Sequence, residues 1–213
     1  MSDPPRSTLM KLAEPLGEDE IHLWSGVHRP ESGRAPLRAL LARYLGVSPD
    51  EVVLGEEAHG RPVIDLPRAA GLFFNWTHSH GRVLVAVARN VRPGVDLESV
   101  LRRRPDVVAL ARRFFDPAEA AAIERCDPPQ GLRCFLRIWC CKEALLKAHG
   151  RGLGFGMDRV SVTLEAAGPR IRTFADEQPE AWQLVELAQD DGWVAALAWR
   201  GEPRRLVWRG GLD

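Results

Sequence analysis

The amino-acid sequence predicts an α+β protein made of two similar halves. In the first half, a helical pattern at 35–45 is followed by several short strands. In the second half, helical patterns between 106 and 148 are again followed by strands. A chain of 213 residues can hold two such units, and its hydrophobic content of 45% is ample for packed cores. We expect three segments: a loose N-terminal arm over 1–17, one α+β half over 18–100 and a second α+β half over 101–213.

The first half is predicted to begin with an extended piece at 21–25 and the helix at 35–45. Leucines and Tyr44 share one side of this helix, and Gly46 ends it. The segment 83–89 is apolar and rich in valine, which favours a buried strand. Further short strands are expected at 51–54, 61–64, 72–77 and 94–98.

The second half is predicted to be helical first and extended later. Asp116, followed by Pro117 and Glu119, is a typical helix start, with a capping side chain, a first-turn proline and an acidic third residue. Gly150 ends the last helix. The expected helices are 106–114, 117–125 and 131–148. The expected strands are 159–164, 182–188 and 193–199.

The charge of the chain gives no sign of a nucleic-acid or membrane partner. Lysine plus arginine number 29, the same as aspartate plus glutamate, so no overall field attracts a polyanion. The first 17 residues lack the apolar core of a signal peptide, and no apolar run is long enough to cross a bilayer. We therefore expect a cytoplasmic protein.

The four cysteines are expected to be reduced and free. They form no C-x-x-C pair, which disfavours a zinc site. Buried thiols are the better interpretation in a cytosolic protein. The residues are Cys126, Cys134, Cys140 and Cys141.

Two short acidic patterns carry the chemistry. Asp96 and Glu98 lie two residues apart in a predicted strand, so both side chains point to the same face. Glu143 and Lys147 lie four residues apart in a predicted helix and therefore share one side of it. Mg²⁺ binds a few oxygen ligands and keeps waters and substrate phosphates in its shell. Two carboxylates from a strand, one from a facing helix and a neighbouring lysine predict Mg²⁺-assisted attack on a phosphate.

Four short blocks along the chain match one family pattern in order and spacing. They are 60–62 (G-R-P), 74–78 (F-N-W-T-H), 94–98 (G-V-D-L-E) and 139–153 (W-C-C-K-E-A-L-L-K-A-H-G-R-G-L). Together they resemble the G-K-P, F-N-x-S-H, G-V/I-D-I-E and W-x-x-K-E-x-x-x-K-x-x-G-x-G-L motifs of the 4′-phosphopantetheinyl transferases of the surfactin-synthetase-activating type. The segment A-R-R-F-F at 111–115 also resembles that family's A-x-R-F-F helix end.

The resemblance implies the duplicated α+β fold of this family, with the active site between the halves. It implies transfer of the 4′-phosphopantetheine group from coenzyme A to a serine of an apo acyl or peptidyl carrier protein, with release of adenosine 3′,5′-bisphosphate. The implied ligands of Mg²⁺, or of Mn²⁺, are Asp96, Glu98 and Glu143. The implied contacts to coenzyme A are Arg29, Arg61, Pro62, Thr77, His78, Lys142 and Lys147.

These implied contacts differ in kind. Arg29 is expected at the 3′-phosphate of coenzyme A, and His78 at one of its phosphates. Thr77 takes the place of the family's serine, and the main chain around Pro62 would pack against the adenine. Lys142 faces another side of its helix than the neighbouring glutamate and is expected to be a secondary phosphate contact.

The expected reaction needs charge neutralisation, an in-line nucleophile and a base. Glu143 is the expected base, because one of its oxygens could bind metal while the other faces the serine hydroxyl. Asp96 or a metal-bound hydroxide is the alternative. Lys147 would keep Glu143 ionised or touch a phosphate; an ordinary helix ion pair is the alternative for it.

A basic and apolar surface is expected beyond the metal strand. It would suit the acidic helix that a carrier protein presents beside its serine. A solvated linker followed by core-facing side chains is an equally good interpretation. The residues are Arg102, Arg103, Arg104, Val107, Val108 and Leu110.

The chain departs from the family pattern in its N-terminal section, which is shorter ahead of His28 and Arg29. Some phosphate contacts would then be missing or would come from Arg34 or Lys11. Trp76 is bulkier than the residue usual in its block. These departures affect the expected affinity for coenzyme A more than the chemistry.

Three functions are compatible with these observations. The first is an active transferase that serves carrier domains of polyketide, nonribosomal-peptide or fatty-acid synthesis. The second is a degenerate relative that binds coenzyme A or a carrier protein without transfer, against which the complete acidic set argues. The third is a metal-dependent phosphohydrolase, which would need no docking surface. We expect a monomer, because both sides of the cleft come from one chain.

Overall fold

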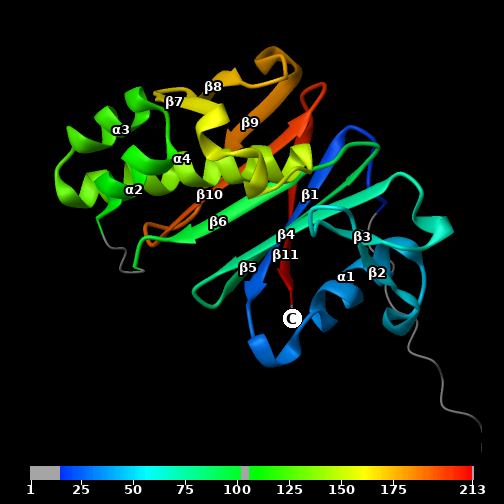
Figure 1. Ribbon diagram of the computed structural model, residues 1–213. Helices are drawn as coiled ribbons and strands as arrows, with labels where there is room; N and C mark the ends of the chain where they lie inside the picture. The colour runs from blue at the N-terminus through cyan, green and yellow to red at the C-terminus, as the bar shows by residue number, and fades with distance from the viewer. Residues whose placement is uncertain (1–14, 102–105, 213) are drawn as a thin grey trace, which may run out of the picture.

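The computed structural model describes residues 15–101 and 106–212 and confirms the predicted α+β class (Figure 1). Within this part of the chain the α-helices are α1 (Ala35–Leu45), α2 (Val107–Phe114), α3 (Pro117–Glu124) and α4 (Pro128–His149). The strands are β1 (Glu20–Val27), β2 (Leu54–Glu56), β3 (Pro62–Ile64), β4 (Leu72–Ser79), β5 (Arg82–Arg89), β6 (Gly94–Ser99), β7 (Val160–Glu165), β8 (Gly168–Phe174), β9 (Trp182–Glu186), β10 (Trp193–Arg200) and β11 (Arg205–Leu212).

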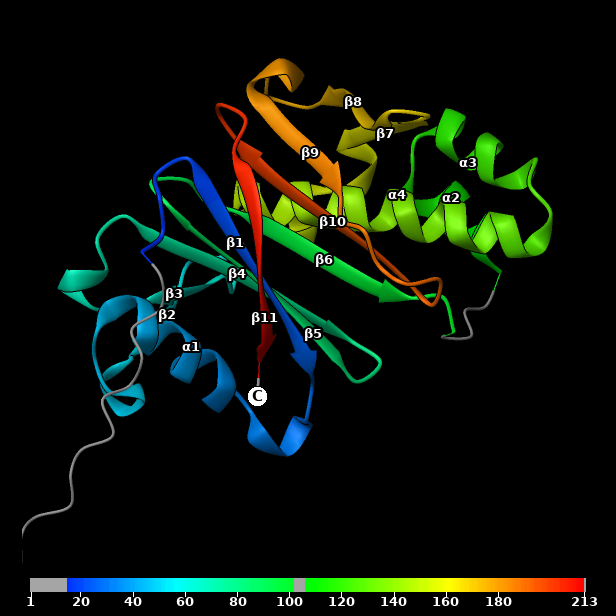
Figure 2. The same ribbon diagram turned by 180° about the vertical axis from the view of Figure 1, so that it is seen from behind.

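The larger strands form two sheets. One has the order β11-β1-β5-β4 and the other the order β6-β10-β9. β11 pairs with β1 in parallel, and the remaining pairs in these sheets are antiparallel. β2–β3 and β7–β8 are separate two-stranded pairs. The four-stranded sheet lies beside α1 and the three-stranded sheet beside α4 (Figures 1 and 2).

The alternation of side chains along the strands determines which residues face which layer. Ile21 of β1 packs in a core between the two sheets, together with Val95 and Leu97 of β6. Because strand side chains alternate, Asp96 and Glu98 point to the opposite face of β6, toward α4. Two acidic side chains are thus held at a sheet–helix boundary instead of in the apolar core.

α4 and β6 approach each other closely at Gly94. A Cβ atom at this position would lie 2.0 Å from the main-chain oxygen of Ala144 and 2.3 Å from the main-chain nitrogen of Ala148. Only glycine avoids these clashes. The approach brings the turn of α4 that carries Glu143 and Lys147 directly against β6.

Several predicted elements are present, and others differ from the prediction. The helix expected at 35–45 is α1, and Gly46 caps it with a left-handed backbone. The strand expected at 51–54 is wrong in its first residues, because Pro49–Glu51 forms a 3-10 helix that begins with a capping box. β8 and β11 are not predicted from the sequence, because both are rich in arginine and glycine and show no buried-strand pattern.

The division of the chain near residue 100 stays a prediction, and two strands cross it. β6 precedes the division but pairs with β10, whereas β11 follows it but pairs with β1. Residues 1–14 of the expected N-terminal arm lie outside the described residues. No helix in the described part of the chain is long and apolar enough to cross a membrane. The four cysteines are free thiols, as expected.

Lys142 is not at the surface of α4 but in the core of the second half. Its side chain is 0% exposed and lies 2.5 Å from the carboxylate of Glu119 on α3. Its ammonium group also donates to the main-chain oxygen of Met157 at 2.9 Å and lies 4.6 Å from the centre of the Phe115 ring. Glu119 in turn accepts the main-chain N–H of Val162 at 2.7 Å. The predicted contact between Lys142 and coenzyme A is therefore wrong, because the lysine is enclosed and its charge is already paired.

Burial acts in opposite directions on the two partners of this pair. It lowers the pKa of Lys142 and raises the pKa of Glu119, and in each case it outweighs the attraction of the opposite charge. The short contact keeps both groups ionised and hydrogen-bonded. Breaking such a pair leaves one uncompensated charge in the core.

We predict that Lys142→Met lowers the free energy of unfolding by about 3–5 kcal/mol, because Glu119 loses its buried counter-ion. The measurement is urea denaturation followed by circular dichroism. Arg170→Met removes an exposed cation of β8 and serves as the control, with an expected change within about 0.5 kcal/mol. Equal losses in the two variants would contradict the structural role of the pair.

Candidate active site

The acidic side chains identified in the sequence meet where β6 faces α4. Lys147 of α4 donates to Asp96 Oδ1 at 2.7 Å and to the main-chain oxygen of Val95 at 3.2 Å. Asp96 is only 5% exposed. The strand pattern and the helix pattern thus supply one site, with Asp96 at its centre.

β4 lies beside β6 and reaches it through side chains at every second residue. Thr77 Oγ1 donates to Asp96 Oδ1 at 3.0 Å, and Ser79 Oγ donates to Glu98 Oε2 at 2.9 Å. Asn75, two residues before Thr77, also contacts β6, because its Oδ1 accepts a hydrogen bond from the main-chain N–H of Val95 at 2.9 Å. Ser79 is a further site residue that the sequence blocks do not include, although its spacing of two from Thr77 in a strand could have indicated it.

Glu143 stands among charges of both signs. Burial raises the pKa of its carboxyl group to about 7, and the nearby Asp96 and Glu98 add to this, while Lys147 opposes it. Burial would lower the pKa of Lys147, but Asp96 and Glu143 outweigh it and raise that pKa. The three carboxylates and the lysine therefore form one electrostatic group.

The side chains of this group are carboxylates, the kind of ligand that a hard cation prefers. Asp96 Oδ2 is buried and has no hydrogen-bond partner among the described residues. Mg²⁺ commonly uses one or two carboxylates and completes its shell with water and substrate phosphate. Within 15–101 and 106–212, no three histidine, cysteine, aspartate or glutamate side chains already form a group that could hold a metal ion. The ligand set Asp96, Glu98 and Glu143 accordingly stays a prediction.

Arg61 forms hydrogen bonds to three segments of the chain near this site. Its guanidinium donates to the main-chain oxygens of Phe74 at 3.1 Å, of Pro93 at 3.0 Å and of Lys147. Burial lowers its pKa to about 10. Arg61 is only 7% exposed, and its N–H groups donate to main-chain oxygens. It therefore has a structural role, which the sequence does not indicate.

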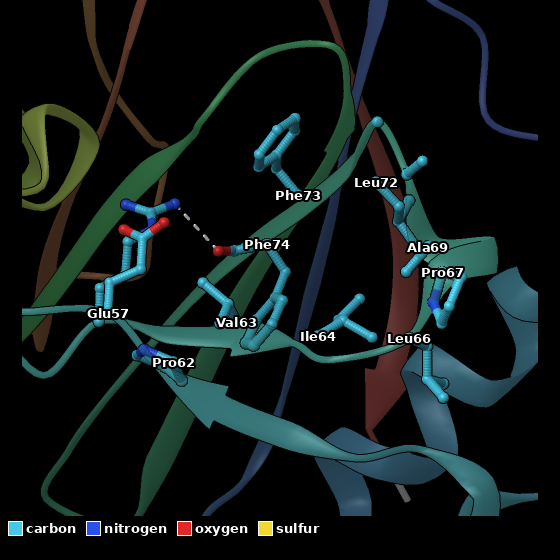
Figure 3. Close-up of a pocket in the computed structure, with 13 residues that line it drawn as sticks. Glu57, Pro62, Val63, Ile64, Leu66, Pro67, Ala69, Leu72, Phe73 and Phe74 are labelled. Atoms are coloured by element: carbon cyan, nitrogen blue, oxygen red, sulfur yellow. Dashed lines mark hydrogen bonds between the residues drawn. The ribbon is translucent and has the colours of Figure 1, made fainter.

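A pocket of about 400 Å³ opens next to Arg61 (Figure 3). Pro62, Val63 and Phe74 line it with other apolar side chains, and the dashed line in Figure 3 marks the bond to the Phe74 oxygen. The packing of adenine against the main chain near Pro62 stays a prediction, and an apolar pocket is present at this turn.

His78 lies at the exposed end of β4, in contact with the residues that precede α1. Its ring centre is 3.9 Å from that of His28 and 5.5 Å from that of Trp76. Burial lowers the pKa of His78, with smaller effects from His28 and Lys147. Arg29 follows His28 and is exposed. The structure thus brings the two predicted phosphate contacts, Arg29 and His78, to the same end of the sheet.

The expected carrier-binding surface is described only in part. Arg102, Arg103 and Arg104 lie outside the described residues, as does Lys11. The apolar residues that follow, Val107, Val108 and Leu110, pack partly buried against the core of the second half. This supports the core-facing interpretation for these three, and docking at the arginines stays a prediction. Arg34 forms an exposed ion pair with Glu56.

Comparison with known proteins identifies the family. A sequence model of the 4′-phosphopantetheinyl transferase superfamily matches residues 92–198, which include β6 and α4. The 4′-phosphopantetheinyl transferase HetI of Nostoc sp. is 37% identical over 207 residues, covering 93% of this chain and 84% of that protein. The chain belongs to the 4′-phosphopantetheinyl transferase superfamily. The family predicted from the sequence blocks, and with it the enzyme class, is confirmed.

Other phosphopantetheinyl transferases are similar over shorter stretches. A putative 4′-phosphopantetheinyl transferase of Synechocystis sp., slr0495, is 34% identical over 175 residues, covering 78% of this chain and 69% of that protein. The 4′-phosphopantetheinyl transferase Sfp of Bacillus subtilis is 29% identical over 142 residues, covering 66% of this chain and 60% of that protein. The chain thus matches about three fifths of the length of Sfp.

We predict that Glu143→Gln stabilises the metal-free transferase at alkaline pH. Folding raises the pKa of Glu143 from its ordinary value of 4.5 to about 7. The folded protein therefore binds this proton more tightly than the unfolded chain, and stability falls as pH rises through that range. The variant lacks this loss. Its free energy of unfolding should exceed that of the wild type by on the order of 2–3 kcal/mol at pH 8 and by much less at pH 5.

The measurement is urea denaturation of both proteins at the two pH values with a chelator of divalent cations. A variant whose advantage is the same at both pH values would contradict the environment assigned to Glu143.

Proposed function

We propose that this transferase moves the 4′-phosphopantetheine group of coenzyme A to the serine hydroxyl of an apo acyl or peptidyl carrier protein, with Mg²⁺ as cofactor. The serine oxygen attacks the pyrophosphate of coenzyme A, and the phosphorus–oxygen bond on the nucleotide side breaks. Adenosine 3′,5′-bisphosphate is the leaving group. The observation that carries the proposal is the convergence of Asp96, Glu98, Glu143 and Lys147 between β6 and α4.

Glu143 is the carboxylate whose pKa best suits it to take the proton of the serine. A base works best when its pKa is near the working pH, and the pKa of Glu143 is raised to about 7 by burial and by its acidic neighbours. Asp96 is less suited, because its Oδ1 already accepts hydrogen bonds from Thr77 and Lys147. We therefore prefer Glu143 over Asp96 as the base.

Lys147 and the metal would compensate the negative charge of the site. Lys147 donates a hydrogen bond to Asp96, and its positive charge favours the ionised form of Glu143. Mg²⁺, held by Asp96, Glu98 and Glu143, would supply charge neutralisation for the pyrophosphate. Mn²⁺ has similar ligand preferences and would be an alternative.

Coenzyme A would extend from this acidic group toward the end of β4. His78 and Arg29 offer donors for its phosphates at that end. The apolar pocket beside Pro62 offers a surface for the adenine. Both assignments rest on the arrangement of side chains around β4 and on the resemblance of the sequence blocks.

The decisive experiment is the intact mass of an apo carrier protein after incubation with the transferase, coenzyme A and Mg²⁺. A gain of one phosphopantetheine unit that disappears with chelator is the expected result. Release of phosphopantetheine without any gain in carrier mass would favour a phosphohydrolase. Binding of coenzyme A or carrier without either product would favour a degenerate binding protein.

We predict that Glu143→Gln reduces transfer by roughly 10²–10⁴-fold, as expected for removal of a general base. Single-turnover transfer, read by carrier mass, gives the rate, and circular dichroism shows that the variant is folded. Arg170→Met is the matched control, because Arg170 is exposed on β8. Near-normal turnover in Glu143→Gln would remove Glu143 from the base role.

We also propose that the transferase acts as a monomer, in the cytoplasm, where coenzyme A and carrier proteins meet. Every side chain placed in the site comes from one chain. Sedimentation equilibrium at micromolar concentration should therefore give the mass of one chain. An obligate dimer or trimer would overturn this proposal.

A further inference from the structure

Thr77 and Ser79 provide neutral hydrogen-bond donors to the acidic group. Their hydroxyls donate to Asp96 Oδ1 at 3.0 Å and to Glu98 Oε2 at 2.9 Å. Both residues are buried and lie on the same face of β4, two positions apart. β4 and β6 belong to different sheets, so these bonds join side chain to side chain across the boundary between the sheets.

The bonds distinguish the two oxygens of Asp96. Oδ1 accepts from Thr77 Oγ1 and from Lys147 Nζ, whereas Oδ2 is buried without a partner among the described residues. A carboxylate held by two donors on one oxygen has little freedom to rotate, and its second oxygen keeps one direction. That second oxygen is the one left without a hydrogen bond among the described residues, and it is where a cation would bind.

We propose that Thr77 and Ser79 are positioning residues, which orient Asp96 and Glu98 for metal binding. This inference rests on the proposed function, because it concerns the same acidic group. It differs from the role first expected for Thr77, a direct contact with coenzyme A. The hydroxyl of Thr77 points to Asp96 and is occupied there.

Hydroxyl groups suit this task because they orient an anion without neutralising it. A cationic donor such as Lys147 also offsets part of the carboxylate's negative charge, whereas a hydroxyl leaves that charge in place. Groups that orient metal-binding side chains in this way are typically worth roughly 10–100-fold in metal affinity. The predicted effect is therefore large enough to measure directly.

The experiment measures binding of Mn²⁺ to the full chain saturated with coenzyme A and without carrier protein, from the paramagnetic resonance signal of free Mn²⁺. Thr77→Val and Ser79→Ala should each weaken Mn²⁺ binding by roughly 10–100-fold. Thr77→Ser keeps the hydroxyl and should bind Mn²⁺ nearly as the wild type does.

Matched controls come from β7 and β8, where Ser161 Oγ and Thr173 Oγ1 lie 2.7 Å apart. Ser161→Ala and Thr173→Val remove hydroxyls of the same kind at a distance from the acidic group and should leave Mn²⁺ affinity unchanged. Thermal unfolding is recorded for all variants. If Thr77→Val does not fold, Ser79→Ala and the pair Thr77→Ala and Thr77→Ser make the same comparison.

A second measurement separates positioning from direct contact with coenzyme A. Calorimetric titration of coenzyme A into metal-free protein, with chelator, should give the same affinity for Thr77→Val as for wild type. A clear loss of coenzyme A affinity in the absence of metal would make Thr77 a ligand contact and overturn the inference.

The two proposals fail in different ways. If the wild type binds Mn²⁺ and both variants bind it equally well, the positioning role is wrong while the metal site stands. If the wild type binds no Mn²⁺ in the presence of coenzyme A, the metal site of the proposed function is wrong, and the positioning role falls with it.

Discussion

The close contact between α4 and β6 at Gly94 is the constraint on which the site depends. Main-chain atoms of Ala144 and Ala148 occupy the space that any Cβ at this position would need. The turn of α4 that carries Glu143 and Lys147 is thereby held against the strand that carries Asp96, so that a 2.7 Å bond can form between Lys147 and Asp96. A larger residue at 94 would separate the acidic side chains even if all of them were retained.

This proximity concentrates negative charge, which the surrounding residues compensate only in part. Three carboxylates share the space with one lysine, and the pKa of Glu143 is raised to about 7 mainly by burial and then by Asp96. Thr77 and Ser79 donate hydrogen bonds to the carboxylates of β6 without adding positive charge. The remaining negative charge is what a cation would compensate, at a cost in stability when the cation is absent. By contrast, the buried charges of Glu119 and Lys142 pair with each other.

The sequence predicts those parts of the site that depend on local periodicity. Asp96 and Glu98 share a face because a strand alternates, and Glu143 and Lys147 share a face because a helix repeats every 3.6 residues. The burial of Lys142 depends on Glu119, which lies on another helix, so its own neighbours in sequence give no sign of it.

The same distinction applies to the fold. Gly46 ends α1 as a local signal predicts. β11 could not be predicted, because its arginines and glycines form a strand only through parallel pairing with β1, far away in the sequence. Arg61 likewise resembles a ligand-binding residue in its sequence block. Its guanidinium is held by main-chain oxygens of residues far away in the sequence, which the block does not show. β6 of the first segment pairs with β10 of the second, and β11 of the second pairs with β1 of the first, so these pairings are also long-range. The site therefore depends on residues from both segments. The carboxylates lie on a strand of one sheet and the hydroxyls that orient them on a strand of the other, so any movement between the sheets must alter the geometry of the acidic group.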